Sequence, residues 1–246
     1  MKKILVIGAF GQIGSDLVPA LQKKYGKSNV VAVGHNQSPK NYQGIFELAE
    51  ITDLKQIEEI IKKYSIGEVY HLASVLTSYD PDDTWNINVN GLINILKLAR
   101  EYKFRLFWPS SVAVFGPTTP QENTPQSSIM EPETMYGITK VAGELLCQYY
   151  YRTYGVDVRT IRYPRIISWK SNPTKSGSDY MVNVFFAAIK DDKFVMPVSL
   201  KTAAPIIYID DVVSSILKIM SVDPKRLSTR MGYNISVISC TAEEIS

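Results

Sequence analysis

Short apolar runs alternate with segments of helical periodicity along most of this chain. The first run covers residues 4–7, and apolar residues then recur at helical spacing over residues 13–24. Further strands are expected at 30–33, 45–48, 68–72, 104–108 and 156–161, and further helices at 53–64 (capped by Asp53), 85–102 and 134–154. Strands that are apolar on both faces and separated by helices are typical of a parallel sheet covered on each side. The sequence therefore predicts an α/β fold with a doubly wound parallel sheet.

The pattern loosens after residue 162. Residues 117–132 are polar and rich in proline, which predicts a surface loop, and the helices expected at 179–189 and 210–220 are separated by irregular sequence. We interpret residues 1–162 as the domain that contains the sheet. Residues 163–246 are interpreted as a smaller substrate-binding lobe at the carboxyl edge of that sheet.

Composition excludes several classes of protein. The 246 residues carry 27 basic and 24 acidic side chains without a long run of one sign, so neither a nucleic acid nor a membrane is expected as a partner. Cys147 and Cys240 are far apart and have no histidine at metal-ligand spacing, which predicts no disulfide, no metal site and a reducing compartment. Glycines interrupt the apolar start before a cleavage site, so we expect a cytoplasmic protein rather than a secreted one.

A glycine-rich turn stands between the first strand and the first helix. In the segment Gly8-Ala9-Phe10-Gly11-Gln12-Ile13-Gly14, the first glycine suits a tight turn. Gly11 would let a pyrophosphate approach the backbone, and Gly14 would let helix and strand pack closely. The alternative is that the three glycines are only turn residues. The position after the first strand favours a dinucleotide-binding (Rossmann-type) domain over residues 1–162, with Gln12 and Ile13 at the cofactor.

The end of the second strand leaves the choice of cofactor open. Sheets of this type that bind NAD usually have an acidic residue there, but this chain has Gly34-His35-Asn36, with neither a carboxylate nor an arginine. His35 and Asn36 suit hydrogen bonds to a ribose, and Lys40 suits a 2′-phosphate, unless the segment is simply a polar loop. Glu50 and Ile51, after the third strand, are expected at the adenine edge or, alternatively, in a helix-capping region.

A tyrosine and a lysine four residues apart share one face of the helix expected at 134–154. Lys140, together with the positive nicotinamide of an oxidised cofactor, would stabilise the phenolate of Tyr136 as a base for an alcohol proton. With 15 tyrosines in the chain, such a pair also arises by chance. Ser111, directly after the strand expected at 104–108, provides a hydroxyl that could bond the same substrate oxygen. The order of glycine turn, serine, tyrosine and lysine is much less expected by chance.

With these residues in place, the chain resembles the extended short-chain dehydrogenase/reductase family over almost its whole length. The resemblance is closest to its short-chain-type L-threonine 3-dehydrogenases, and it rests on His71-Leu72-Ala73, Asn88-Val89-Asn90-Gly91, the segment from Trp108 to Pro120, Asn123-Thr124-Pro125-Gln126, Thr134-Met135-Tyr136-Gly137, Arg162-Tyr163-Pro164 and Ile167-Ser168-Trp169-Lys170. It implies NAD-dependent oxidation of L-threonine to 2-amino-3-ketobutyrate.

The resemblance also implies roles for individual residues. Tyr136 would be the base, Lys140 would orient the nicotinamide ribose, and Ser111 would hold the substrate hydroxyl. The implied cofactor contacts are Gly8, Gly11, Gln12, Ile13, Gly14, His35, Glu50, Ile51, Leu72, Ala73, Asn88, Tyr136, Lys140, Tyr163 and Ile166, and the implied substrate contacts are Ser74, Thr77, Ser111, Tyr136 and Ser178. For Ser178 the alternative is an N-cap of the following helix. Related proteins commonly pair through the helices that correspond to those expected here at 85–102 and 134–154, which implies a homodimer.

The chain departs from that family in several places. Gly34 replaces an acidic residue, Arg165 replaces a glycine, and Gly177-Ser178 replaces two threonines. Family members also continue for several dozen residues, which implies an incomplete lobe. Two other functions therefore stay open: a nucleotide-sugar epimerase or dehydratase of the same family, and a non-catalytic dinucleotide-binding protein.

Overall fold

A seven-stranded sheet forms the centre of the protein. The computed structural model describes residues 2–76, 80–170, 180–190, 193–235 and 237–245. The sheet has the order β3-β2-β1-β4-β5-β6-β9, and every neighbouring pair is parallel. Its strands are β1 (Lys3–Ile7), β2 (Val30–Gly34), β3 (Ile45–Leu48), β4 (Ile66–His71), β5 (Arg105–Ser111), β6 (Val158–Tyr163) and β9 (Tyr233–Asn234).

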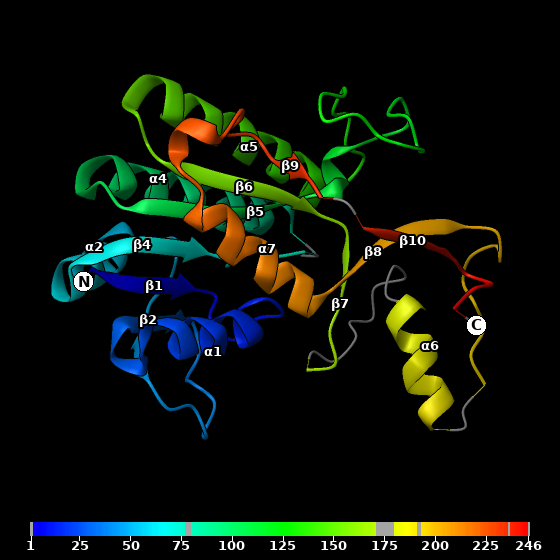
Figure 1. The fold of residues 1–246 in the computed structure, drawn as a ribbon, viewed down its shortest axis with the longest axis horizontal. Coiled ribbons are helices and arrows are strands. Elements are labelled where there is room, and N and C mark those ends of the chain that lie inside the picture. Colours follow the sequence, from blue (N-terminus) through cyan, green and yellow to red (C-terminus); the bar gives the residue numbers. More distant parts are fainter. Residues whose placement is uncertain (1, 77–79, 171–179, 191–192, 236, 246) are drawn as a thin grey trace.

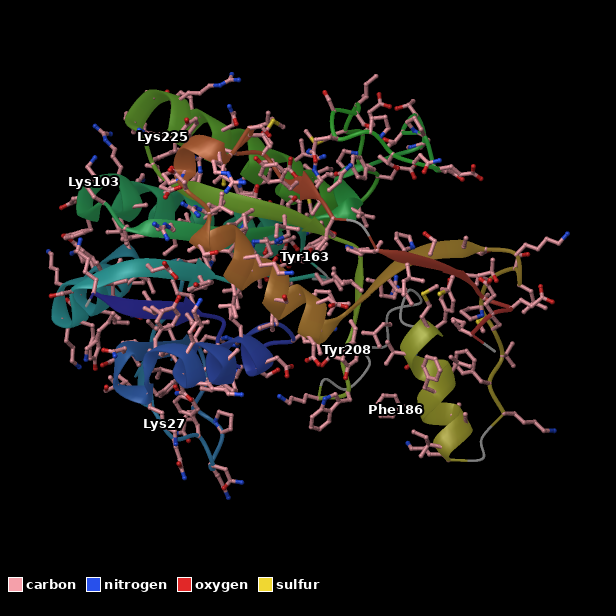
Figure 2. The ribbon with its side chains drawn as sticks, in the orientation of Figure 1. Lys27, Lys103, Tyr163, Phe186, Tyr208 and Lys225 are labelled. Carbon is pink, nitrogen blue, oxygen red and sulfur yellow. The ribbon has the colours of Figure 1, made fainter. Side chains whose placement is uncertain are left out.

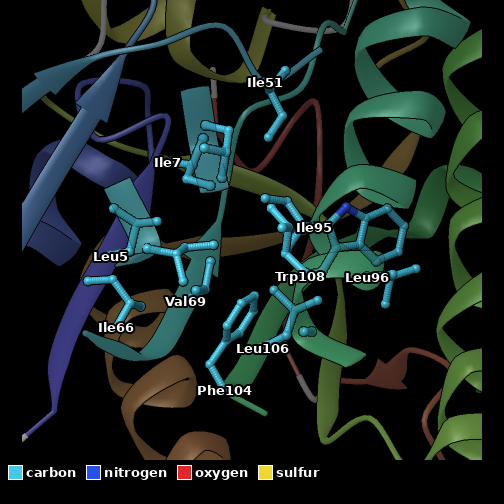
Figure 3. Packing of buried hydrophobic residues seen from close by; sticks show 14 of the residues in the cluster. Leu5, Ile7, Ile51, Ile66, Val69, Ile95, Leu96, Phe104, Leu106 and Trp108 are labelled. Carbon is cyan, nitrogen blue, oxygen red and sulfur yellow. The ribbon is translucent and has the colours of Figure 1, made fainter. Parts of the chain in front are cut away.

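Helices cover both faces of this sheet, as the sequence predicts (Figure 1). The helices α1 (Gly14–Tyr25) and α7 (Ile209–Ser221) lie on one face, and α2 (Leu54–Tyr64), α4 (Gly91–Tyr102) and α5 (Met135–Tyr154) lie on the other. Alternate residues of β1 serve the two cores: Ile4 and Val6 pack toward α1 and α7, whereas Leu5 and Ile7 belong to the opposite core (Figure 3). The doubly wound fold is therefore confirmed.

Local signals set the ends of two helices. The Asp53 carboxylate accepts hydrogen bonds from Lys55 N at 3.0 Å and Gln56 N at 3.2 Å, which confirms it as the N-cap of α2. Thr134 caps α5 in the same way, and α5 ends at Gly155, whose φ is 69°. Such capping is readable from sequence because donor and acceptor are only a few residues apart.

Most predicted strands and helices of the large sheet begin and end within two residues of their predicted bounds, but two elements differ by more. The strand predicted at 104–108 continues through Pro109 and Ser110 to Ser111, so this serine ends the strand instead of following it. The helix predicted at 85–102 consists of α3 (Pro81–Trp85), the π-helical turn η2 (Asn86–Asn90) and α4. The loop predicted at 117–132 is confirmed, since it holds no helix or strand. Short 3-10 helices in the described part of the chain are η1 (Lys27–Asn29), η3 (Val112–Val114) and η5 (Pro224–Arg226).

A second, three-stranded sheet lies beyond the carboxyl ends of the large sheet's strands, toward which the arrowheads of β1, β4 and β6 point in Figure 1. It contains β7 (Arg165–Ile167), β8 (Ala203–Tyr208) and β10 (Ile238–Thr241), and α6 (Tyr180–Ile189) packs near it. None of these three strands was predicted. The domain boundary at residue 162 stays a prediction. All three strands of the small sheet come after this residue, but so do β9, which belongs to the large sheet, and α7, which packs on it.

Candidate active site

A phenol and a hydroxyl meet at the carboxyl end of β5. Ser111 ends that strand, and Tyr136 lies in the first turn of α5. A hydrogen bond joins their side chains and favours the ionised form of the phenol. The Ser111 oxygen also accepts from Ala113 N at 3.2 Å, which holds the hydroxyl in place as the cap of η3. The structure thus brings these two predicted residues together.

A close backbone contact explains why they meet. A Cβ on Gly137 would lie 2.3 Å from the Ala113 carbonyl oxygen, so only glycine lets the first turn of α5 approach η3 this closely. This contact sets the distance between Tyr136, which precedes Gly137, and Ser111, which caps η3. Gly137 is therefore a positioning residue for the pair.

Lys140 lies one helical turn after the tyrosine and is buried. Its ammonium nitrogen donates to the Pro109 carbonyl at 2.9 Å and lies 4.6 Å from the centre of the Trp108 ring and 5.3 Å from that of Tyr136. Burial lowers the pKa of this lysine to about 7, although the nearby Cys147 and Glu144 act in the opposite direction. The predicted trio is therefore one cluster.

The phenol differs from the sequence-based expectation in one respect. Tyr136 is half-buried, and desolvation raises its pKa to about 12, with the Ser111 hydrogen bond lowering it only partly. Lys140, which we expected to lower this pKa, does not offset the burial. The protein's own groups thus favour the neutral phenol.

His71 is a neighbour of this cluster to which no role was assigned from sequence. It ends β4, is fully buried, and among the described residues neither ring nitrogen has a hydrogen-bond partner. Burial, and then the positive charge of Lys140, lower its pKa to about 3, so the imidazole is neutral. The position of a histidine at the end of a buried strand could have marked it as a candidate site residue. Nothing in the sequence, however, shows that it lies near Lys140 of α5.

The glycine turn has the geometry that the sequence indicates. Gly8 has a φ of 78°, its N–H donates to the Val33 carbonyl at 3.0 Å, and a Cβ there would lie 2.7 Å from Ala73 N. A Cβ on Gly14 would lie 2.4 Å from the Gly8 carbonyl oxygen. The fold itself therefore requires both glycines, and the turn brings Gly8 against Ala73 at the end of β4.

Gly11 is different, because the protein has room for a side chain there. A Cβ would lie 3.5 Å from its nearest neighbour, the Gly8 carbonyl oxygen, which is an ordinary contact. The adjacent start of α1 has Ile13 as its N-cap residue and no side-chain cap, although Ser15 N and Asp16 N already donate to the Gly11 and Ile13 carbonyls. A glycine that packing does not require, beside an uncapped helix end, fits the close approach of a pyrophosphate.

The other predicted cofactor residues divide into two groups. Gln12 reaches β7, where its amide donates to the Ile166 carbonyl at 3.0 Å, and Leu72 donates to the Ile7 carbonyl at 2.8 Å, so these residues lie around the turn. The others have varied surroundings: Ile51 is buried in the core, and Glu50 and His35 are exposed, with the His35 imidazole 2.9 Å from the Asn36 amide. The Tyr163 hydroxyl, labelled in Figure 2, bonds Ser215 of α7 at 2.7 Å.

Asn88 clamps the segment after β4 to α5. Its Oδ1 accepts from the Ser74 hydroxyl at 3.0 Å and Val75 N at 2.8 Å, and its Nδ2 donates to the Val75 carbonyl at 2.9 Å and Thr139 Oγ1 at 3.1 Å. Both ends of the amide are thus used within the protein. Ser74 remains beside the cluster, whereas Thr77 and Ser178 lie outside the described residues.

A buried ion pair below Ser111 supports the site and was not predicted. Glu144 accepts from Arg162 Nε and Nη2, both at 2.8 Å, and from the Ser110 hydroxyl at 2.6 Å. Arg162 also donates to the Gln126 carbonyl at 3.1 Å and to Asn234 Oδ1 at 3.0 Å, which ties the 117–132 loop and β9 to the sheet. These residues come from one helix, three strands and a loop, so no sequence spacing relates them.

Among the described residues, no helix is long and apolar enough to cross a membrane, and no cluster of three potential metal ligands occurs.

Comparison with known proteins places this geometry in a family. The sequence profile described as "NAD dependent epimerase/dehydratase family" matches residues 4–235. An uncharacterized epimerase/dehydratase of Staphylococcus aureus is 38% identical over 251 residues, covering 100% of this chain and 78% of that protein. The holo form of a GalE-like L-threonine dehydrogenase from Cupriavidus necator has a TM-score of 0.94 and 39% identity, covering 98% of this chain and 80% of that chain. A monomeric L-threonine 3-dehydrogenase from a metagenome has a TM-score of 0.93 and 43% identity, and the match covers 98% of this chain and 79% of that chain. The chain therefore belongs to the NAD-dependent epimerase/dehydratase family.

Proposed function

We propose that this protein oxidises L-threonine to 2-amino-3-ketobutyrate with NAD. The observation that carries the proposal is the hydrogen-bonded pair of Ser111 and Tyr136 next to the buried Lys140, at the carboxyl end of β5. The similarity to structures named as L-threonine dehydrogenases supports this choice of substrate.

In this proposal, the Tyr136 oxygen accepts the proton of the substrate hydroxyl, and the Ser111 hydroxyl donates to the same substrate oxygen. Lys140, fixed by the Pro109 carbonyl, keeps its side-chain nitrogen beside the phenol ring. A bound NAD supplies the acceptor for the hydride from the substrate carbon. The turn of Gly8, Gly11 and Gly14 would hold its pyrophosphate.

Substrate contacts are proposed for Ser74, Thr77 and Ser178. Ser74 donates its hydroxyl proton to Asn88, so its oxygen keeps lone pairs for a donor such as an amino group. The clamp formed by Asn88 would keep this hydroxyl beside α5.

NADH formation from L-threonine tests the proposal. Tyr136→Phe should reduce kcat/KM by about 100-fold or more, the usual contribution of a positioned base. Tyr149→Phe is the matched control, because Tyr149 lies on the same helix but is exposed. Turnover of threonine by Tyr136→Phe at the parent rate would refute the role of the phenol. Turnover of a UDP-sugar instead of threonine would refute the substrate.

We also propose that two copies associate through the outer face of α5. Ile138, Leu145 and Tyr149 are exposed on this helix by 43%, 54% and 52%, so they form an apolar surface that a second copy would bury. Light scattering tests this, and the mass of a single chain at high concentration would contradict it.

A further inference from the structure

The segment after β2 is unusual in its charge. In the doubly wound folds that select NAD, a carboxylate at the end of this strand bonds the ribose hydroxyls and repels a 2′-phosphate. Between Gly34 and Phe46 the only formally charged side chain is that of Lys40. The strand end thus lacks the group that discriminates against a phosphorylated ribose.

This segment is fixed beside the glycine turn. The ring of Tyr42 packs edge-on against Phe10 of the turn, with 5.0 Å between centroids, and its hydroxyl accepts from Gln22 of α1 at 3.1 Å. Lys27 donates to Gln43 Oε1 at 2.9 Å. Residues 35–41 therefore connect the end of β2 to an anchor on the turn that would hold the pyrophosphate.

Two of the carboxylates near the strand end are ion-paired. Glu47 of β3 forms an ion pair with Lys63 at 2.7 Å, and hydrogen bonds from Lys63 and Tyr64 hold its pKa below the usual range. Asp16 in the first turn of α1 pairs with Lys170. Glu50 is exposed after β3, where Ala49 N donates to the Gly34 carbonyl at 3.1 Å, so its influence needs a test of its own.

We propose that the protein binds NADP as well as NAD, with the 2′-phosphate beside Gly34 and stabilised by the Lys40 ammonium and the side chains of His35 and Asn36. This inference rests on the proposed binding of a dinucleotide by the glycine turn. A phosphate carries nearly two negative charges, for which an ammonium and neutral donors are suitable partners.

Gly34 provides a clean test because its environment accepts a side chain. A Cβ there would lie 3.5 Å from the Asn36 carbonyl oxygen and 3.6 Å from the Phe10 and Phe46 rings, all ordinary contacts. Its φ is outside the left-handed region. Gly34→Asp should therefore fold like the parent while placing a carboxylate at the strand end, and Gly34→Asn adds the same volume without the charge.

Calorimetric titration of NAD and NADP into the parent and these variants measures the selectivity without turnover. The parent should bind both with dissociation constants within about tenfold of each other, and Gly34→Asp should weaken NADP selectively by about tenfold or more through repulsion of like charges. Gly34→Asn should keep the parent's selectivity. Lys40→Gln should weaken NADP alone, and more so at low salt, because an exposed charge is screened at high salt.

The outcomes separate the two proposals. If neither dinucleotide binds, the proposed function fails together with this inference. If NAD binds and NADP does not, this inference alone is wrong. If Glu50→Gln is needed before NADP binds, Glu50 is the group that discriminates, and the assignment of the phosphate to the side of Gly34 is overturned.

Discussion

Two glycines of the same turn should respond in opposite ways to the same substitution. The methyl group of Gly14→Ala would lie 2.4 Å from the Gly8 carbonyl oxygen and 2.6 Å from the Ala9 carbonyl atoms, so backbone must move. Forcing extra volume into a packed site costs about 1 to 3 kcal/mol. For a chain of this size, 1 kcal/mol lowers Tm by about 2 to 4 °C, so a fall of about 2 to 12 °C is expected.

Gly11→Ala should leave the fold intact. Its methyl group meets only the Gly8 carbonyl oxygen at 3.5 Å, and a Gly-to-Ala change at a compatible position often gains about 0.4 to 1 kcal/mol through the unfolded state. The same methyl group would occupy the space through which a pyrophosphate approaches the backbone. The dissociation constant of NAD should then rise by about tenfold or more, equivalent to about 1.4 kcal/mol.

Thermal denaturation and calorimetric titration of NAD provide the two readouts. Gly14→Ala should lose stability, whereas Gly11→Ala should lose affinity at unchanged or higher Tm. If Gly11→Ala bound NAD as tightly as the parent, the pyrophosphate would not approach this glycine. If both variants lost equal stability, the distinction between packing and binding glycines would be wrong.

Three further changes test the supporting structure. Glu144→Gln leaves the buried Arg162 without a counter-charge and should lower the free energy of unfolding by about 3 to 5 kcal/mol in urea denaturation; a loss below about 1 kcal/mol would contradict the buried pair. Burial lowers the pKa of Lys140 from 10.5 to about 7, so unfolding takes up a proton between these pH values. The free energy of unfolding of the parent should therefore rise relative to that of Lys140→Met as the pH increases from about 7 to about 9. A difference that stays constant with pH would refute the lowered pKa. Asn88→Leu leaves buried groups without their hydrogen-bond partner and should lower the free energy of unfolding by at least about 2 kcal/mol. Asn90→Ala, at an exposed position, should lower it little, and equal losses would argue against the clamp.

The large sheet was predictable because its signals are local. A run such as residues 30–33 is apolar throughout because both of its faces are covered, and the cap at Asp53 is formed by N–H groups two and three residues away. The glycine turn is equally local, since it begins directly after β1. Each of these features is determined within a window of about a dozen residues.

The small sheet and the last strand of the large sheet, β9, escaped prediction because these strands depend on distant partners. In β8 (Ala203–Tyr208), exposed and half-buried residues alternate over only the first four positions, and β9 has only two residues, so neither gives a long enough period to predict a strand. Their hydrogen bonds reach across the chain: Cys240 is opposite Ala204, and Tyr233 is opposite Ile161. Pairings of that kind are formed by the tertiary fold and leave no pattern in a single segment.

The end of β5 shows why the site was predicted only in part. Proline usually interrupts a central strand because it lacks an N–H, so the sequence predicts that the strand stops before Pro109. In the structure the strand continues, and the Pro109 carbonyl accepts a hydrogen bond from Lys140 Nζ. The strand thus positions the lysine as well as the serine, a link that appears only once α5 is packed on the sheet.

Burial at this site shifts the pKa values of Lys140 and Tyr136 in opposite directions. It lowers the pKa of Lys140 to about 7 and raises that of Tyr136 to about 12, because the interior disfavours the charged form of each. Spacing along a helix predicts that the two side chains are neighbours, but not how far they are desolvated. Among the described residues, the Ser111 hydrogen bond lowers the phenol's pKa, and in the proposed reaction the positive charge of an oxidised dinucleotide would favour ionisation of Tyr136 further. In the proposed reaction, cofactor binding and activation of the base are therefore thermodynamically linked.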